Sequence, residues 1–540
     1  NFFKMQRFSL YALLFACATM LSAQDNFSST LPIIVINTQG AEITDEPKIT
    51  ARMGIIDNGA GERNALSDDF NAYDGFIGIE VRGSSSQSFP KIGYGLETRL
   101  ADGTDNQVEL LGFPIEEDFV LHGPYSDKSL IRNALAYHLA RELMPYAPRI
   151  RMVEVVINND YLGVYLFTEK IKRDRNRVDV KKLSPEDTNG NEQTGGYILK
   201  FDKFTGEDFD LPILFESNYN ADTEVEQTIR FLYHYPKPEN IVGSQRAYIE
   251  SWMHNFEQAL AGDDFLDQND GYRQYVDLES FVDFLLINEI SRNVDGYRLS
   301  TFMYKERDDQ GGKLHMGPVW DFNLAFGNAD YCGGAAPQGW GYNFGVICPD
   351  DFWQLPFWWD RLREDPDFVA MLGDRWNELR NGAFSDERLN ATIDSLVNVM
   401  DDAPRRNFER WPVLGEYVWP NVFLGETYEA EIDYLKRWVE DRTSWMDGAI
   451  WSLTPVERIV PAAALSLQPN PTDGRLTILS DITGELFSVQ VYDAYGRLIY
   501  SGDRLAPGVS IDLSPFAAGI YLLQARKANG EVVTGRVIRR

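Results

Sequence analysis

Two aspartates that lie about one hairpin apart are the residues of this chain best suited to chemistry. Asp295 belongs to the run NEISRNVDGYRLSTFMYK, and Asp321 lies between two large aromatic residues in GPVWDFNLAFGN. An unpaired carboxylate in an apolar site is costly, so packing alone does not explain an Asp in such surroundings. Phosphoryl transfer from a nucleotide needs one carboxylate to hold the metal on the phosphates and another to orient the attacking hydroxyl. The pair therefore predicts the catalytic centre of a kinase-like enzyme.

Two neighbours of Asp321 could complete a nucleotide and metal site. Trp320 offers a ring that can stack on a base, and Asn323 offers a second oxygen ligand. Mg²⁺ prefers oxygen ligands, and the scarcity of His and Cys nearby agrees with a hard cation. Each aspartate alone is also compatible with a turn or a helix cap. The combination is what favours a magnesium-dependent centre.

A serine-rich loop and an acid at a strand end are weaker candidates for the same site. Arg82 and the serines after it follow a predicted strand and precede Lys91. Small residues let backbone N–H groups approach phosphate oxygens, and a nearby Lys adds a mobile positive charge. The loop is not a P-loop, because GxxxxGK[ST] is absent, and by itself it fits a plain hairpin with a surface Lys better. Glu169 ends the strand GVYLFTE and could accept from an adenine amino group or pair with Lys91.

Length and charge exclude several classes of protein. The chain has 540 residues, enough for two or more domains, and a formal net charge of −31. Such an acidic chain is a poor partner for a nucleic-acid backbone or an anionic membrane and suits an extracellular protein. No segment after the N-terminal region is apolar enough to cross a membrane. We therefore expect no nucleic-acid partner and no transmembrane segment in the mature chain.

The first 23 residues have the pattern of a signal peptide. Lys4 and Arg7 precede an apolar run, 10–21, that is too short to span a bilayer and is followed by small residues. A buried N-terminal helix is the alternative.

Removal of this segment would leave two cysteines, Cys332 and Cys348. An exported protein with two cysteines a short loop apart is expected to pair them, which would contribute about 3 kcal/mol in the chain-entropy model. Two unpaired buried thiols are the alternative.

Hydrophobic periodicity places the candidate residues on a mixed α+β scaffold. A helix over 128–143 could be capped by Ser126 or Asp127, and Asn159-Asp160 is a plausible hairpin turn. Strands are expected at 31–38, 76–83, 94–100, 153–158, 163–171, 301–305 and 313–316, and further helices at 248–260, at 278–290 and within 351–452. After Pro461 the pattern changes to short alternating strands separated by turn residues. This pattern predicts a small antiparallel β-sandwich over 463–540.

Several long runs of the chain resemble the CotH kinase family, atypical protein kinases related to spore-coat protein kinases. The matching runs are IEVRGSSSQSFPK, DKSLIRNALAYHLAREL, EVVINNDYLGVYLFTEKIKRDRNRVDV, TGGYILKFDK, LLINEISRNVDGYRLSTFMYK and GPVWDFNLAFGNADYC. The resemblance implies an atypical protein-kinase-like, two-lobed body over 30–455, with an N-lobe at about 30–205 and a C-lobe at about 206–455.

The resemblance also implies roles for the candidate residues. Asp295 would be the catalytic acid or base, Asp321 would bind the metal, and Trp320 would stack on adenine. Lys91 and Arg82 would face phosphate, and Glu169 would lie near the nucleotide. One position departs from the kinase pattern, because Ser300 stands where kinases carry an Asn as second metal ligand. Asn323 or Asn293 could compensate for this change.

The end of the chain resembles the type A sorting domain of the bacterial type IX secretion system. The matching pieces are PNPTDGRLTI, YDAYGRLIY, AAGIYLLQ and the basic terminus. The resemblance implies a Bacteroidetes-type bacterium and export through the periplasm by the type IX secretion machinery. The body would then be secreted or attached to the outer-membrane cell surface.

Together these features favour an exported kinase that uses ATP and Mg²⁺ or Mn²⁺ to phosphorylate Ser or Thr of a secreted or surface protein. The alternative is a surface structural or binding protein on a kinase fold that has lost catalysis, an interpretation that Ser300 motivates. A carboxylate-pair hydrolase acting on glycans is a third hypothesis, with no further support in the sequence.

Overall fold

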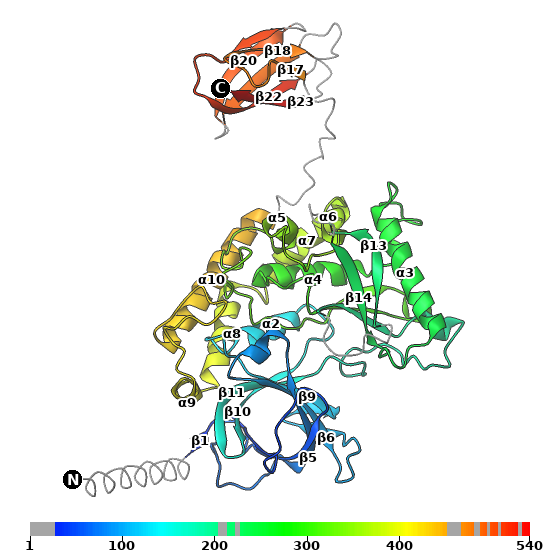
Figure 1. Ribbon diagram of the computed structural model, residues 1–540, viewed down its shortest axis with the longest axis vertical. Coiled ribbons are helices and arrows are strands. Elements are labelled where there is room, and N and C mark those ends of the chain that lie inside the picture. The colour runs from blue at the N-terminus through cyan, green and yellow to red at the C-terminus, as the bar shows by residue number, and fades with distance from the viewer. Residues whose placement is uncertain are drawn as a thin grey trace, which may run out of the picture. The chain divides into compact units, whose positions relative to one another are not determined.

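The computed structural model describes residues 27–203, 213–221, 227–450, 466–479, 487–493, 497–505, 509–526 and 532–540 (Figure 1). They belong to two compact units that divide between Thr454 and Pro455. The expected signal peptide at 1–23 lies outside the described residues.

The first half of the larger unit is a closed barrel of seven strands in the order β10-β11-β9-β6-β5-β3-β2. Neighbouring strands are antiparallel except β10 and β2, which close the barrel as a parallel pair. Alternate residues, among them Ile34, Ile77 and Val153, point inward and fill the interior. The strands are β2 (Ile33–Asn37), β3 (Ile49–Ile56), β5 (Tyr73–Arg82), β6 (Gly93–Arg99), β9 (Asp118–His122), β10 (Ile150–Ile157) and β11 (Asp160–Glu169).

The hairpin between β10 and β11 turns one residue earlier than expected. Ile157 pairs with Asp160, so the two loop residues are Asn158 and Asn159, with φ of 49° and 66°. Two successive left-handed residues make the type I′ turn that matches strand twist, and asparagine tolerates that conformation well. The expectation of an Asn159-Asp160 turn is therefore wrong by one position.

Helix α2 (Arg132–Ala140) lies between the barrel and the rest of the larger unit (Figure 1). It starts four residues later than expected, because residues 127–131 form a turn in which Leu130 has a φ of 63°. The N-cap residue is Ile131, so the expectation of Ser126 or Asp127 at the cap is wrong, although Asp127 Oδ2 still accepts from the Arg132 N–H at 2.8 Å. Its Oδ1 also accepts from the buried Arg132 guanidinium at 2.6 Å, which fixes the helix entry.

An antiparallel sheet and a set of helices complete the larger unit and confirm the α+β class. The sheet has the order β13-β14-β12-β15-β16 and packs against α3 and α4. Its strands are β12 (Tyr197–Phe201), β13 (Leu214–Asn220), β14 (Thr228–Tyr235), β15 (Thr301–Lys305) and β16 (Leu314–Met316). The longer helices are α3 (Gly243–Ala261), α4 (Leu278–Ser291), α7 (Pro366–Arg380), α8 (Asp386–Asn398), α9 (Ala403–Arg410) and α10 (Tyr428–Ala449). Between β16 and α7 lie the short helices α5 (Phe344–Ile347) and α6 (Trp358–Leu362), and Cys332 is bonded to Cys348 as predicted.

The smaller unit is the expected β-sandwich-like region. One sheet has the order β17-β18-β21 and the other β20-β19-β22-β23. Leu476, Ile478, Val489, Val491 and Leu523, drawn from both sheets, form its buried core. Its strands are β17 (Ser466–Gln468), β18 (Arg475–Leu479), β19 (Phe487–Asp493), β20 (Leu498–Leu505), β21 (Ser510–Asp512), β22 (Gly519–Arg526) and β23 (Val532–Arg539). Across the described parts of both units, no helix has the length and apolar character needed to cross a bilayer.

Candidate active site

Asp295 lies in the loop that joins α4 to β15. The helix ends at Ser291, and Arg292 reverses the chain with a φ of 43°. The backbone N–H of Asp295 donates to Asn293 Oδ1 at 3.3 Å, and its Oδ1 accepts from Arg298 Nη2 at 2.8 Å. Its side chain is 20% exposed, so the carboxylate reaches solvent from a largely buried position.

Asp321 follows β16 and is held in an uncommon backbone conformation. Its φ is 62°, the left-handed region that non-glycine residues rarely occupy. Helix α2 supports this turn, because the Tyr137 hydroxyl accepts from the Asp321 N–H at 3.1 Å and Asn133 Oδ1 accepts from the Phe322 N–H at 2.5 Å. Backbone strain of this kind persists where surrounding contacts fix it, and it is commonest at functional sites.

The structure brings the two aspartates into one electrostatic environment. Burial, followed by the negative charges of Asp295 and Asp202, raises the pKa of Asp321 to about 6, against the opposing effect of Arg82 and Lys203. Burial also raises the pKa of Asp295, and the nearest counter-charge is Arg298. Carboxylates that repel one another in a buried position are stabilised by a divalent cation. Binding of Mg²⁺ or Mn²⁺ by these carboxylates stays a prediction.

Asp202 and Lys203 are site residues that the sequence analysis missed. They directly follow β12, whose Phe201 pairs with Thr301 at the start of β15. The Lys203 Nζ donates to Ser85 Oγ at 3.1 Å, which brings the serine-rich loop toward the aspartates. The sequence did carry a signal for these two residues. They are a charged pair at the end of the strand-like run TGGYILKFDK, where a side chain can enter a site.

Arg82 contacts the residue before Asp321, and its role as a phosphate ligand stays a prediction. Its guanidinium carbon lies 4.9 Å from the centroid of the Trp320 ring. Burial lowers the pKa of Arg82, and the charge of Asp321 has the largest opposing effect. Its Nη1 is buried and has no hydrogen-bond partner within the described parts of the chain. A buried donor of this kind is one that a phosphate oxygen could satisfy.

Trp320 and Asn323 lie on either side of Asp321. The Trp320 ring packs against Tyr137, with ring centroids 6.0 Å apart and planes at 24°, and it also contacts Arg82. The Asn323 carbonyl accepts from Asn328 Nδ2 at 2.9 Å, which fixes the turn after Asp321. Adenine stacking by Trp320 and metal binding by Asn323 stay predictions.

Lys91 is directed toward α9. It is 2% exposed, and its Nζ donates to Asn407 Oδ1 at 2.7 Å and lies 5.1 Å from the Tyr165 ring centroid. Burial holds the pKa of Lys91 well below its usual value. The ammonium group of Lys91 is therefore hydrogen-bonded to helix α9.

Glu169 is buried and paired with arginine. Its Oε1 and Oε2 accept from Arg149 Nη1 at 2.9 and 3.1 Å, and Arg177 Nε lies 3.8 Å from Oε1. The expectation that Glu169 pairs with Lys91 is wrong. The Glu169 carboxylate binds Arg149, which directly precedes β10, and Lys91 binds Asn407 instead. A role of Glu169 near the nucleotide stays a prediction.

A second group of carboxylates lies apart from the two aspartates. Glu116, Glu117 and Asp118 are close enough together to hold a cation. The ammonium group of Lys172 already contacts all three, at 2.9 Å from Glu116 Oε1 and from Asp118 Oδ2. Lys170 lies 4.0 Å from Asp118 and Arg177 lies 4.0 Å from Glu116, so three cations of the protein face the three carboxylates.

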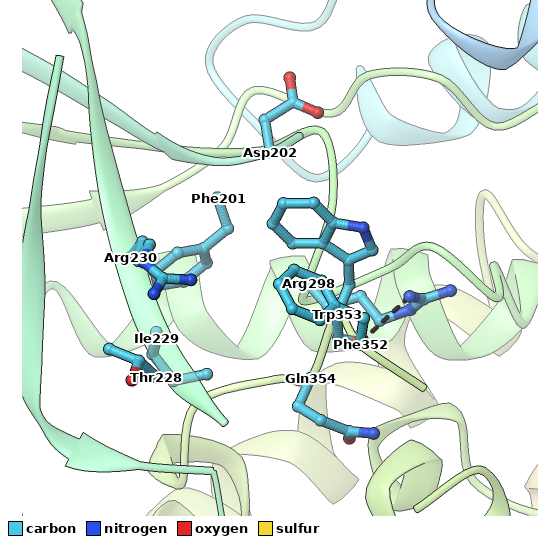
Figure 2. Close-up of a pocket in the computed structure, with 9 residues that line it drawn as sticks. All are labelled: Phe201, Asp202, Thr228, Ile229, Arg230, Arg298, Phe352, Trp353 and Gln354. Carbon is cyan, nitrogen blue, oxygen red and sulfur yellow. Dashed lines mark hydrogen bonds between the residues drawn. The ribbon is translucent and has the colours of Figure 1, made fainter. Parts of the chain in front are cut away.

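A pocket is lined in part by Arg298, the residue that binds Asp295 (Figure 2). Phe201 and Arg230 stand on one side, Trp353 and Arg298 on the other, and Asp202 lies at one end. Arg298 and Asp202 therefore belong both to this pocket and to the surroundings of the aspartates. The other lining residues are Thr228, Ile229, Phe352 and Gln354.

The two aspartates and the basic residues around them lie in a part of the chain that a family model matches. The chain belongs to the CotH kinase protein family, whose model matches residues 79–446. This range contains every site residue described above.

The second family match is a secretion system C-terminal sorting domain over residues 466–539. It implies handling by the type IX secretion machinery and export to the cell surface or the medium. A search of curated proteins found no match. Among solved structures, one similar chain is a DUF3244 family protein with an immunoglobulin-like β-sandwich fold from Bacteroides vulgatus ATCC 8482, at 18% identity and a TM-score of 0.13. The match covers 14% of this chain and 96% of that chain.

Proposed function

We propose that this chain is an exported phosphotransferase that moves the γ-phosphoryl group of ATP to Ser or Thr of secreted or cell-surface proteins. The observation that carries the proposal is the shared electrostatic environment of two half-buried aspartates, Asp295 and Asp321, opposite Arg82 and Lys203. Such a set of charges suits a metal-bound triphosphate, since both the phosphates and the cation find counter-charges.

In this proposal Asp321 and Asn323 hold Mg²⁺ or Mn²⁺. The cation supplies charge neutralisation for the β- and γ-phosphates. The unpaired Nη1 of Arg82 and the ammonium of Lys203 bind phosphate oxygens, and the Trp320 ring borders the base. Residues from both expected lobes contribute: Arg82 and Lys203 come from 30–205, and the two aspartates come from 206–455.

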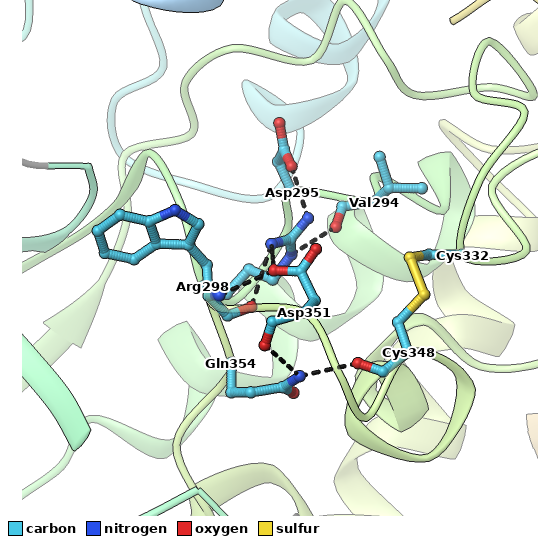
Figure 3. Close-up of a disulfide and its surroundings, with 8 residues drawn as sticks. Val294, Asp295, Arg298, Cys332, Cys348, Asp351 and Gln354 are labelled. Atoms are coloured by element: carbon cyan, nitrogen blue, oxygen red, sulfur yellow. Dashed lines mark hydrogen bonds and ion pairs between the residues drawn. A yellow bond between two sulfur atoms is a disulfide. The ribbon is translucent and has the colours of Figure 1, made fainter. Parts of the chain in front are cut away.

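Asp295 is proposed to orient the acceptor hydroxyl and receive its proton. Arg298 binds Oδ1, and within the described parts of the chain the other oxygen, Oδ2, has no recorded partner (Figure 3). We assign the pocket of Figure 2 to the acceptor, because Arg298, which binds Asp295, also lines it. An extended Ser- or Thr-containing segment would pass Phe201 and Trp353 to reach Oδ2.

The competing function is a kinase fold that binds a nucleotide without transferring phosphate. Ser300 favours it, because a hydroxyl is a weaker metal ligand than the Asn found there in kinases. The position of Lys91, bonded to Asn407, also leaves the phosphates with fewer cations than expected.

Transfer of ³²P from labelled ATP by the purified, signal-free chain tests the proposal. Wild type should label itself or an added acceptor protein, and Asp295→Asn and Asp321→Asn should each lower the rate at least 100-fold. Asp309→Asn is the matched control, because Asp309 is exposed on the β15–β16 connection. Equal labelling by wild type and Asp321→Asn would contradict the proposal. Stabilisation by nucleotide without any labelling would favour the competing function.

A further inference from the structure

Arg298 is a buried arginine that connects Asp295 to a second, distant segment (Figure 3). Its side chain is 2% exposed. On one side Nη2 binds Asp295 Oδ1 at 2.8 Å, and Nε donates to the Val294 carbonyl at 2.8 Å. On the other side Nη1 contacts Asp351 Oδ1 and donates to the Trp353 carbonyl, both at 3.1 Å. The guanidinium orientation, and with it the Asp295 carboxylate, therefore depends on the segment 351–353.

That segment is in turn held by the disulfide. Gln354 Nε2 donates to the carbonyls of Cys348 and Asp351 at 2.8 and 3.0 Å, and the Asp351 N–H donates to the Cys348 carbonyl at 3.2 Å. Cys348 is bonded to Cys332, which lies 11 residues after Asp321. The bond thus ties the segment that supports Arg298 to the segment that follows the metal-binding aspartate.

We propose that Arg298 is the positioning residue of Asp295 and that the Cys332–Cys348 disulfide keeps Arg298 in place by holding Asp351 and Trp353. A buried guanidinium that loses partners is left with unsatisfied donors and can rotate away. The inference rests on the proposed function in giving Asp295 a catalytic role. It adds that the site becomes competent only after oxidation.

The redox step balances with a common class of reactant. Forming the bond removes two electrons and two protons from the two thiols, and the disulfide of a thiol oxidase accepts them and becomes a dithiol. Such oxidants act outside the cytoplasm, in agreement with the sorting domain.

Hydrogen–deuterium exchange tests the link without requiring activity. Reduction of the purified chain by a phosphine, verified by thiol alkylation, should raise exchange in peptides covering 292–300 and 349–354 at least threefold and leave the barrel strands β3 and β5 unchanged. The Cys332→Ala/Cys348→Ala variant should show the faster exchange before reduction and no change after it. Unchanged exchange at 292–300 in the reduced protein would overturn the inference.

Kinetics of Arg298 variants separate positioning from folding. Arg298→Met should lower kcat at least 30-fold while the Kd for a magnesium complex of a non-hydrolysable ATP analogue changes less than threefold. Arg298→Lys should recover part of kcat, and Arg405→Met, which changes an exposed arginine of α9 away from the pocket, should leave kcat within threefold of wild type. An equal loss of nucleotide affinity in Arg298→Met would overturn the inference. A wild type without phosphotransfer would remove the proposed function, and the exchange measurement would still decide whether the disulfide holds the Asp295 loop.

Discussion

Replacing Asp321 with asparagine should stabilise the folded protein at neutral pH when no divalent cation is present. Burial and the charges of Asp295 and Asp202 raise the pKa of Asp321 from 3.8 to about 6. At 1.36 kcal/mol per pH unit, ionising this carboxyl costs the folded state roughly 3 kcal/mol at pH 7. An uncharged amide avoids that cost. Because part of the cost is screened by solvent, we expect a gain of about 1–3 kcal/mol for Asp321→Asn.

The sign of the pH dependence follows from the raised pKa. The folded state binds the Asp321 proton more tightly than the unfolded state, so the penalty is complete above pH 6 and disappears as the pH falls toward 3.8. The advantage of Asp321→Asn should therefore be largest at pH 7–8 and shrink below pH 6.

Urea denaturation in the presence of a metal chelator measures this effect. Wild type, Asp321→Asn and the control Asp309→Asn are compared at pH 7.5 and 5.0, and then with Mg²⁺ and a non-hydrolysable ATP analogue. We expect the order of stability of wild type and Asp321→Asn to reverse when the metal and nucleotide are added. A variant that is less stable than wild type at pH 7.5 without cations, or a gain of equal size at both pH values, would refute the reasoning.

Three further predictions concern other residues. Arg82→Met should weaken magnesium–nucleotide binding about tenfold in calorimetry, because it removes the unpaired phosphate donor, and an unchanged Kd would contradict this. Lys91→Met should leave that Kd within twofold, since Lys91 binds Asn407; a tenfold loss would show that the lysine reaches the nucleotide. Asp127→Ala should lower the free energy of unfolding by about 3–5 kcal/mol in urea titrations, because it leaves the buried Arg132 guanidinium without its carboxylate, and a loss below 1 kcal/mol would be inconsistent with the ion pair.

Much of the fold could be predicted because alternation and helical periodicity are local signals. The strand at 301–305 matches β15, and the helix at 278–290 matches α4 to within one residue. Closure of the barrel could not be predicted, since the pairing of Ile33 with Glu154 joins residues far apart in the sequence.

The site was predictable where residue type alone indicates the chemistry. The residue types pointed to Asp295 and Asp321, whose roles stay predictions, and the disulfide followed from the cysteine count. Asp202 was missed because only the pairing of β12 with β15 brings it to the aspartates. The contact of Lys91 with Asn407 could not be predicted either, because the two residues lie 316 positions apart in the sequence.

Strand β2 is the first strand of the barrel in the sequence. Its parallel pairing with β10 is also the contact that closes the barrel. About 120 residues must be synthesised and arranged before Ile33 meets its partner on β10, a contact of high sequence separation that slows folding. A shortened version of the protein that begins after Asn37 would leave β3 and β10 as two open edges, where other chains could add as strands. Shortened versions of the CotH kinase region should therefore begin before β2, although the family match itself starts only at residue 79.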